Sequence, residues 1–283
     1  KKKIGKKKKP KKKGVGPGDI HRRITTATEL ERAFIDYFGL KEALIVDAPD
    51  ITYEERLVAA GQLAAWYLEE ILQAHTVLGI SWGTGVSAAV SAVALMHDKQ
   101  IDVVQMIGSV GTVSSVIDGP ELARQLAHKL GGNYYYLHAP LFVDSRATRD
   151  MFLGQPVIAE TLRRALGAQV ALVRIGTTAT GASSFLRAGH LTEEQVTELR
   201  AQGVVGESAG RHFAIDGNTA FDINDRVIAL SLDEVKTIPN VIAVACGLPK
   251  TRAILGALQG GYCSVLATDS VTAQAVLDEA RRG

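Results

Sequence analysis

The sequence predicts an α/β fold, a doubly wound and mostly parallel sheet with helices on both of its faces. Two observations lead to this prediction. Helical and strand patterns alternate through most of the 283 residues, which is typical of sheets assembled from strand–helix–strand units. Many of the strand segments, such as residues 241–245, are unbroken runs of Val, Ile and Ala. A strand that is covered on both faces has this composition, whereas a half-exposed strand alternates between apolar and polar residues.

The individual elements follow one another along the chain. Residues 29–38 have helical periodicity and end at Gly39, which suits the left-handed conformation that closes many helices. Thr192 begins a further helix with a capping pattern, and Asp269 is expected to cap the last one. The predicted helices span residues 29–38, 53–73, 83–96, 120–130, 155–166, 192–202, 250–258 and 270–281. The predicted strands span residues 42–46, 76–80, 101–107, 134–138, 169–175, 227–230, 241–245 and 262–266.

The N-terminal segment differs in charge from the rest of the chain. Residues 1–13 contain ten lysines and no acidic residue, so the net charge of +2 for the whole chain leaves −8 on the remainder. A lysine block of this kind cannot bury apolar surface, and residues 1–20 are therefore predicted to be a disordered basic tail and linker. Such a tail can bind nucleic acid, but its low complexity and the Gly/Pro-rich residues 14–18 favour a segment without that role. Residues 21–283 are predicted to form the folded domain.

Composition also limits the class of protein. No apolar run approaches the length of a membrane span, and no secretory leader is visible, so a cytoplasmic protein without a membrane partner is expected. The two cysteines, Cys246 and Cys263, lack C-x-x-C spacing and are expected to be buried small residues in a reducing compartment. The seven histidines show no metal-ligand spacing, so neither a metal nor a cofactor is predicted.

Residues 77–90 (VLGISWGTGVSAAV) contain two motif matches that point to different enzymes. The first, Gly79 to Gly83, fits the G-x-S-x-G elbow of a hydrolase with Ser81 as nucleophile. A hydrolase triad would need a histidine late in the chain and an H-G-G-G type loop upstream, but no histidine follows His212 and no such loop precedes Ser81. The second match resembles a dinucleotide fingerprint. It would need an acidic residue at the end of the next strand, which instead ends in Gly-Ser.

A phosphate-binding loop fits the same segment better. The order is strand, loop and helix, so the helix N-terminus directs its backbone N–H groups and positive dipole end at the loop. Glycines allow a ligand to approach the backbone, and hydroxyls add further donors. The candidate phosphate-binding residues are Ser81, Trp82, Gly83, Thr84 and Gly85.

A second loop of the same kind follows the strand at residues 241–245. Lys250 and Arg252 lie in the first turn of the next helix, where a cation opposes the helix dipole at a cost of about 0.3–1 kcal/mol. A bound anion would reverse that local sign, and Lys250, nearer to the strand, is the better candidate ligand. Three further polar residues near strand ends or turns are weaker candidates: Gln105, Glu207 and Asp216.

Four segments together resemble the effector-binding domain of SorC/DeoR-type bacterial transcriptional regulators. They are GLKEALIVDAP, VLGISWGTGVSAAVSAV, VVQMIGSVG and IAVACGLPKTRAILGALQGGYCSVLATDSVTAQAVL, and the likeness extends over residues 29–277. The resemblance implies a fold similar to that of sugar-phosphate isomerases and glucosamine-phosphate deaminases. It also implies binding of a phosphorylated sugar without catalysis, and a dimer or tetramer that binds operator DNA.

The resemblance also implies roles for particular residues. It places the phosphate-binding loop on residues 81–85, the ligand-binding lysine on Lys250 and the sugar-contacting acid on Glu207, with Asp216 less secure. Two departures stand out. Many members have Arg-Thr or Thr-Thr where this chain has Thr84-Gly85, so the ligand is expected to differ. Members also carry a helix-turn-helix domain of some 50 residues in front, and residues 1–20 show no helical pattern, so operator binding is expected only through a domain not seen in this chain.

The sequence thus predicts that residues 21–283 are the effector-binding and oligomerisation domain of such a regulator, with a phosphorylated sugar as the effector. The alternative is a sugar-phosphate isomerase or deaminase of similar fold. That enzyme would need a paired general acid and base near the phosphate loop, for which Glu207, Asp216 and His212 are the candidates.

Overall fold

The computed structural model describes residues 24–47, 49–111 and 117–282, which form the predicted α/β fold. Its nine-stranded sheet has a parallel part in the order β1-β9-β8-β5-β2-β3-β4. The strands are β1 Glu42–Val46, β2 Val77–Ile80, β3 Asp102–Gln105, β4 Tyr134–Tyr135, β5 Val170–Thr177, β6 Val204–Ser208, β7 Arg211–Ala214, β8 Asn240–Val244 and β9 Val265–Asp269.

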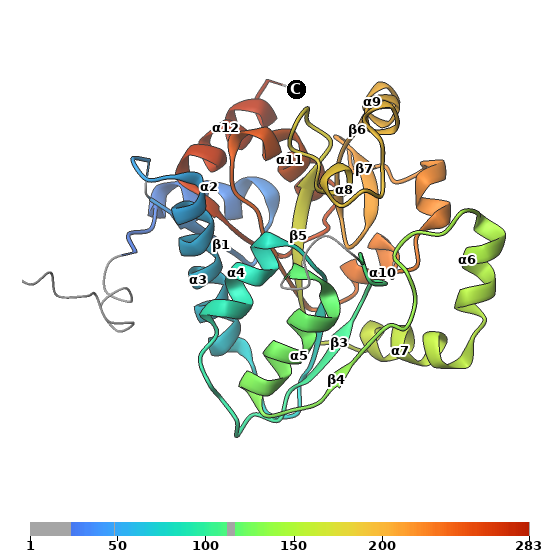
Figure 1. The fold of residues 1–283 in the computed structure, drawn as a ribbon. Helices are drawn as coiled ribbons and strands as arrows, with labels where there is room; N and C mark the ends of the chain where they lie inside the picture. Colours follow the sequence, from blue (N-terminus) through green and yellow to red (C-terminus); the bar gives the residue numbers. More distant parts are fainter. Residues whose placement is uncertain (1–23, 48, 112–116, 283) are drawn as a thin grey trace, which may run out of the picture.

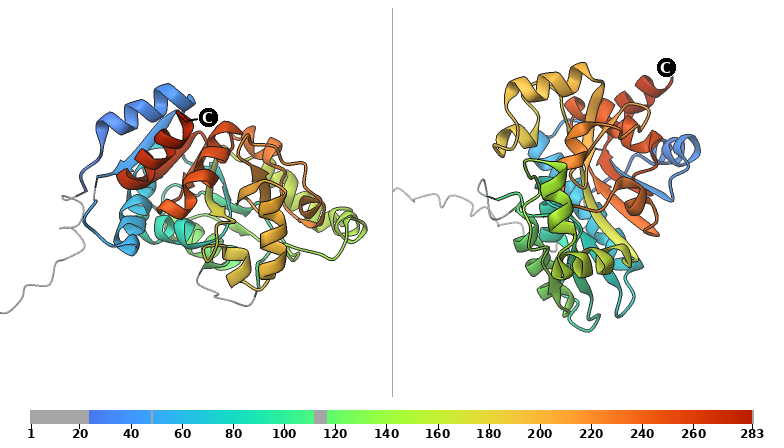
Figure 2. Two further views of the ribbon diagram at one scale, coloured as in Figure 1. Left: turned by 90° about the horizontal axis from the view of Figure 1, so that it is seen from above. Right: turned by 90° about the vertical axis from the view of Figure 1, so that its right-hand side faces the viewer.

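Helices cover both faces of this sheet, as predicted (Figures 1 and 2). One face carries α3 (Tyr53–Ile71), α4 (Thr84–Ala92) and α5 (Gly119–Leu130). The other carries α2 (Thr28–Phe38), α7 (Pro156–Leu166), α11 (Thr251–Gln259) and α12 (Ser270–Ala280). Shorter helices lie in the connections: α6 (Arg146–Leu153), α8 (Ser184–Arg187), α9 (Glu193–Ala201), α10 (Leu232–Lys236) and the 3-10 turns η2 (Asp222–Arg226) and η3 (Leu248–Lys250).

The central strand β5 changes its partners along its length. Residues 170–174 pair in parallel with β8, whereas residues 175–177 pair antiparallel with β6, which continues into β7. All eight residues of β5 are buried. The β6–β7 hairpin turns at Ala209 and Gly210, both with positive φ, as a tight right-twisting hairpin requires.

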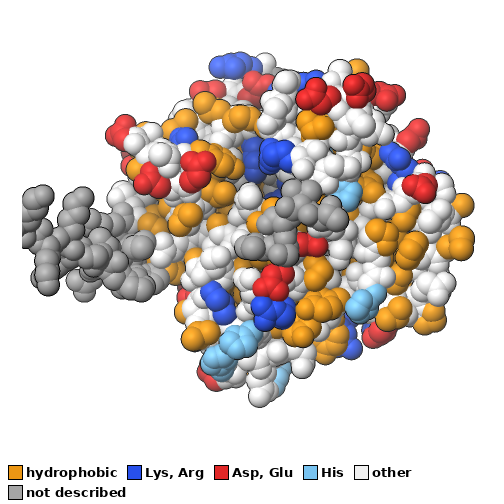
Figure 3. Space-filling model, in the orientation of Figure 1, with side chains coloured by type: hydrophobic (Ala, Val, Ile, Leu, Met, Phe, Trp, Pro, Cys, Tyr) orange, Lys and Arg blue, Asp and Glu red, His pale blue; other side chains and the backbone are white. Residues whose placement is uncertain are grey.

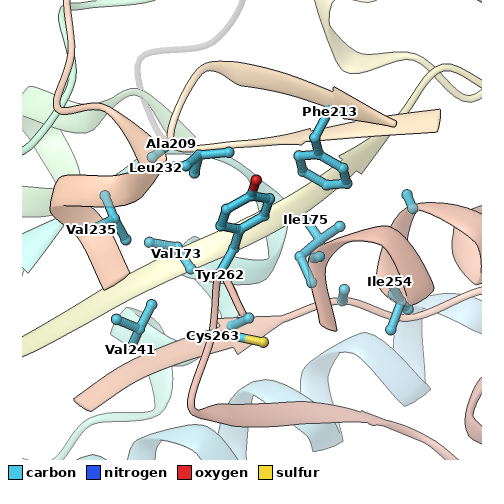
Figure 4. Packing of buried hydrophobic residues seen from close by; sticks show 14 of the residues in the cluster. Val173, Ile175, Ala209, Phe213, Leu232, Val235, Val241, Ile254, Tyr262 and Cys263 are labelled. Carbon is cyan, nitrogen blue, oxygen red and sulfur yellow. The ribbon is translucent and has the colours of Figure 1, made fainter. Parts of the chain in front are cut away.

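The hydrophobic core lies on both sides of the sheet. Figure 4 shows one part of it, where Val173 and Ile175 of β5 pack with Phe213 of β7 and Tyr262. Cys263 lies in the same cluster, and both cysteines are buried and free, which confirms their predicted role as small core residues. Burial raises the pKa of the Cys263 thiol to about 12, so this sulfur stays protonated and unreactive.

Several predicted elements differ from the structure in type or extent. Residues 227–230 form no regular strand; Val227 and Ala229 make isolated bridges to Phe142 and Ile107. The helix predicted for residues 83–96 ends at Ala92, before a turn. The hairpin β6–β7 and the helices α6, α8 and α10 were not predicted, because each of these elements spans only four to eight residues, which is too short for a clear periodic pattern. The basic segment of residues 1–20 lies outside the described residues.

Two predicted helix starts match their caps in the structure. Thr192 forms a capping box with Gln195 at the start of α9, and the Asp269 side chain accepts a hydrogen bond from the Thr272 N–H at the start of α12. At the other end of the chain, α2 closes at Gly39 with φ of 68°, the left-handed value expected there. Local sequence signals therefore fix these boundaries well.

Candidate functional site

A cavity of about 680 Å³ opens at the carboxyl edge of the parallel sheet. It lies where the chain turns in opposite directions: from β2 the sheet continues to β3 and β4, and from β5 it continues to β8 and β9. Such a switch point is the usual ligand site of doubly wound sheets. Figure 3 shows basic side chains gathered beside a hollow on this face of the molecule. The volume is within the range of small-molecule sites.

The loop after β2 forms one wall of this cavity through Trp82, Gly83 and Thr84. Gly83 precedes α4 with φ of 108°, and a Cβ atom there would lie 2.3 Å from Cδ of Arg174, so the position excludes other residues. The Gly83 N–H is already donated to the Ile117 carbonyl, 2.9 Å away. The amides left for a ligand are therefore those of the first turn of α4, which lack acceptors within the helix.

Two other residues of the predicted phosphate loop do not line the cavity. Ser81 is fully buried, and its hydroxyl has no hydrogen-bond partner among the described residues. A Cβ atom on Gly85 would lie 2.6 Å from the Val244 carbonyl oxygen, so this glycine allows α4 to pack closely on β8. The loop thus contains residues that face the cavity and residues that hold the loop against the sheet.

The loop after β8 forms the facing wall with residues 246–250. Gly247 precedes η3 with φ of 101°, and its N–H is donated to Thr272 Oγ1 at 2.8 Å. Lys250 lines the cavity and is half-buried. Burial and the nearby Arg174 lower the pKa of Lys250 to about 8. No described residue forms a hydrogen bond or an ion pair with its Nζ atom.

The helices that begin at this edge differ in how their N-termini are satisfied. Four of them have a side-chain cap, from Thr52 for α3, Asp118 for α5, Ser183 for α8 and Asp269 for α12. In contrast, α4 begins at Gly83 and the continuous η3–α11 unit begins at Gly247, and neither has a side-chain cap. The two uncapped helices are those that the sequence singled out as anion sites.

Four basic side chains line the cavity, and two of them have acidic partners. Arg174 forms an ion pair with Glu207 at 2.5 Å, and Arg56 forms one with Asp269 at 3.5 Å. Lys250 has none, and the other basic side chain, Arg187, donates from Nη1 to the Ala182 carbonyl at 3.1 Å and has no acidic partner in the described part of the chain. Two positive charges of the cavity therefore have no acidic partner within ion-pair distance in the part of the chain that the structure describes.

Arg174 joins the loop after β2 to α8 at the cavity. Its guanidinium stacks on the ring of Trp82 and donates from Nη1 to the Ser184 hydroxyl at 2.8 Å. Burial lowers the pKa of Arg174 and raises the pKa of Glu207, and the charge of each partner opposes the effect of burial on the other. Sequence reasoning missed this residue, although a single arginine within the apolar strand VALVRIGT is a recognisable signal.

The remaining candidates lie outside the cavity lining. Glu207 lies beyond Arg174, 3% exposed. Gln105 is fully buried, and its Oε1 accepts a hydrogen bond from the Leu137 N–H at 3.0 Å. Asp216 is exposed in a turn, where it accepts from the Asn218 N–H at 2.9 Å. The structure thus brings together Trp82, Gly83, Thr84 and Lys250, but not these three.

The described part of the chain contains neither a candidate metal centre nor a candidate membrane span. Among residues 24–47, 49–111 and 117–282, no three His, Cys, Asp or Glu side chains are grouped so that they could hold a metal ion. None of the helices within those ranges combines the length and the apolar composition that a membrane span requires.

Comparison with known proteins agrees with this geometry. The family described as "Putative sugar-binding domain" matches residues 22–278. The deoxyribonucleoside regulator of Bacillus subtilis is 29% identical over 243 residues, which are 86% of this chain and 77% of that protein.

Solved structures of transcriptional regulators are also similar to this chain. A DeoR family transcriptional regulator from Listeria monocytogenes is 29% identical, with a TM-score of 0.81 over 88% of this chain and 98% of that one. The full-length sorbitol operon regulator SorC from Klebsiella pneumoniae is 26% identical, with a TM-score of 0.83 over 88% of this chain and 80% of that one. The chain therefore belongs to the family of sugar-binding domains of SorC/DeoR-type bacterial transcriptional regulators.

Proposed function

We propose that this domain senses a phosphorylated sugar, which binds in the cavity between the loops that follow β2 and β8. The observation that carries the proposal is the uncapped start of α4 in a cavity where Lys250 and Arg187 lack acidic partners among the described residues. Free backbone N–H groups, the positive end of a helix dipole and two cations all favour an anion.

A phosphate group suits this arrangement in charge and in hydrogen bonding. A phosphate monoester carries a charge of about −1.5 to −2 at pH 7 and three strong acceptor oxygens. That charge matches the two uncompensated cations, Lys250 and Arg187. The aromatic rings of Trp82 and Tyr53 also line the cavity, and rings of this kind commonly pack on the apolar faces of small ligands.

We assign direct contact with the phosphate to Thr84, Lys250 and Arg187, beside Trp82 and Gly83, which line the cavity in the loop before α4. Gly85 supports the loop, and Glu207 acts through its ion pair with Arg174. Contacts of Ser81, Gln105 and Asp216 with a ligand stay sequence predictions, because none of these three residues lines the cavity.

The names of the relatives support a regulatory output. Proteins similar to this chain include a deoxyribonucleoside regulator and a sorbitol operon regulator. We propose that ligand binding here changes operator DNA binding of the full-length bacterial protein, acting in the cytoplasm as a dimer or tetramer. Such coupling requires that the ligand bind the two states of the assembly with different affinity.

The alternative, a sugar-phosphate isomerase or deaminase, has little support from the site. Catalysis of that kind needs an acid–base pair within reach of the substrate. Of the three candidates, Glu207 and His212 are buried behind the cavity and Asp216 is exposed in a distant turn, and none of them lines the cavity. We therefore propose a sensor without enzymatic activity.

A thermal-shift screen tests this proposal. The protein is heated with glucose 6-phosphate, fructose 6-phosphate and ribose 5-phosphate, and separately with the three unphosphorylated sugars. A ligand at a hundred times its Kd adds about 2.7 kcal/mol to stability, so at least one phosphosugar is expected to raise the Tm. Stabilisation by free sugars alone would contradict the phosphate site. Conversion of a bound phosphosugar, followed by NMR, would instead support the enzyme.

A further inference from the structure

The cavity lining includes one carboxylate in its described part, that of Asp118. Asp118 lies on the β3 side, just before α5, and is half-buried. Its Oδ1 atom accepts hydrogen bonds from the N–H of Gly119 at 2.8 Å and of Val110 at 3.1 Å. These two bonds fix the side chain at the wall of the cavity.

The second oxygen of this carboxylate is not used within the described part of the protein. No hydrogen bond from a described residue reaches Oδ2, and no described lysine or arginine forms an ion pair with Asp118. The other acids beside the cavity, Glu207 and Asp269, each have an arginine partner. Asp118 therefore presents to the cavity a carboxylate with no cationic partner among the described residues and with one oxygen that none of them engages.

The positive charges belong to other parts of the cavity. Lys250 follows β8, and Arg187 lies on α8, which follows β5. The groups whose charges shift the pKa of Lys250 lie on β5, β6, α8 and the loop after β8, and Asp118 is not among them. One phosphate group already matches these two cations. A second phosphate placed near Asp118 would meet a like charge at close range in a partly enclosed site, where such repulsion is weakly screened.

We propose that Asp118 determines specificity, accepting a hydrogen bond from a hydroxyl group of the ligand and excluding a second anionic group, so that the effector is a sugar monophosphate and not a bisphosphate. This inference rests on the proposed function. A carboxylate that accepts from a sugar hydroxyl forms a charge-assisted hydrogen bond, which is stronger than a neutral one.

Isothermal titration calorimetry on the full chain tests the inference with matched ligand pairs: glucose 6-phosphate against glucose 1,6-bisphosphate, and fructose 6-phosphate against fructose 1,6-bisphosphate. The wild type is expected to bind the monophosphate of a pair at least about tenfold more tightly than the bisphosphate. In Asp118→Asn this ratio is expected to fall about tenfold, because the neutral amide no longer repels the second phosphate.

Asparagine keeps an acceptor oxygen for the cap of α5, so the fold is expected to be retained. Asp118→Ser provides a second neutral cap should the asparagine variant unfold. Glu121→Gln is the matched control: it removes the same charge from α5, but Glu121 pairs with Arg124 and does not line the cavity.

The possible outcomes separate the inference from the proposed function. If the wild type binds bisphosphates as tightly as monophosphates, or if neither neutral variant changes the ratio, the assignment of Asp118 is wrong while phosphosugar sensing stands. An equal change in Glu121→Gln would assign the effect to overall charge and would also overturn the inference. If no phosphosugar binds, the proposed function fails and this inference fails with it.

Discussion

The guanidinium of Arg174 stacks on the indole of Trp82, with Cζ 4.0 Å from the ring centre. This contact joins the central strand β5 to the loop that starts α4. The same guanidinium pairs with Glu207 on β6. The cavity wall and the β6–β7 hairpin are therefore held by one side chain.

Removal of Arg174 is expected to destabilise the fold strongly. Arg174→Met leaves the Glu207 carboxyl buried without its cation, and breaking a buried pair in this way costs about 3–5 kcal/mol. The double variant with Glu207→Gln is expected to lose less stability than the two single variants added together, since neither residue then leaves an unpaired charge. Urea unfolding measures all three, and strict additivity would show that the pair is not coupled.

Lys250 is expected to provide a large part of the affinity for phosphate. Lys250→Ala should weaken phosphosugar binding by at least about tenfold, because a desolvated cation that contacts an anion contributes about 1.5–3 kcal/mol. Arg252→Ala is the control, since Arg252 lies two residues further on, pairs with Glu279 at 3.8 Å and does not line the cavity. Calorimetry measures the phosphosugar affinity of both variants. Equal losses of affinity in the two would show that Lys250 does not contact the ligand.

Phosphosugar affinity is expected to fall at alkaline pH. Burial lowers the pKa of Lys250 to about 8 in the free protein, and a bound anion would raise that pKa by favouring the ammonium form. Affinity should thus be nearly constant around pH 7 and decrease as the pH rises through 8, by up to about tenfold per pH unit. Lys250→Arg should remove this decrease, because arginine stays charged throughout. A pH-independent affinity in the wild type would contradict the assignment.

Acid is expected to destabilise the protein through His212. Burial lowers the pKa of His212 to about 3, whereas the unfolded chain takes up a proton as the pH falls below about 6.5. Between these values the unfolded state binds more protons, so stability falls with pH. The loss between pH 7 and pH 5 is about 2 kcal/mol from this residue. Urea titrations at both pH values should show a smaller loss in His212→Phe, and an unchanged loss would exclude the residue as the cause.

Gly85 is expected to matter for stability because α4 packs closely on β8 at this buried position. Gly85→Ala would place a Cβ atom 2.6 Å from the Val244 carbonyl and push α4 away from β8, at a cost of about 1–3 kcal/mol. Gly154→Ala is the matched control, since Gly154 has a helical φ and a Cβ there would meet only ordinary contacts. Thermal unfolding of the two variants compares them directly, and equal Tm values would contradict the close packing.

The parallel part of the sheet could be predicted because its strands are uniformly apolar and alternate with amphipathic helices. The β6–β7 hairpin could not, since Gly206 and Glu207 interrupt its apolar pattern. Both residues are explained by contacts with segments that are distant in the sequence. A Cβ atom at Gly206 would lie 2.6 Å from Cβ of Ala253 on α11, and Glu207 pairs with Arg174.

The candidate site was predictable where it depends on topology. Loops that follow parallel strands meet at one edge, so Trp82, Gly83, Thr84 and Lys250 could be brought together from the sequence. Which charged side chains of the cavity have partners was not predictable from the sequence. Whether Arg174, Arg187 or Asp118 keeps its charge available depends on which acids and amides lie beside it in space, and no local pattern records that.

The cavity is assembled from segments that are far apart in the chain, since its lining runs from Tyr53 to Lys250. It therefore exists only once the sheet between those segments has formed, and a folding intermediate with half of the strands has no binding site. A ligand that binds here stabilises the native state against global unfolding. Its presence should slow amide hydrogen exchange in the buried strand β5 as well as in the loops that touch it.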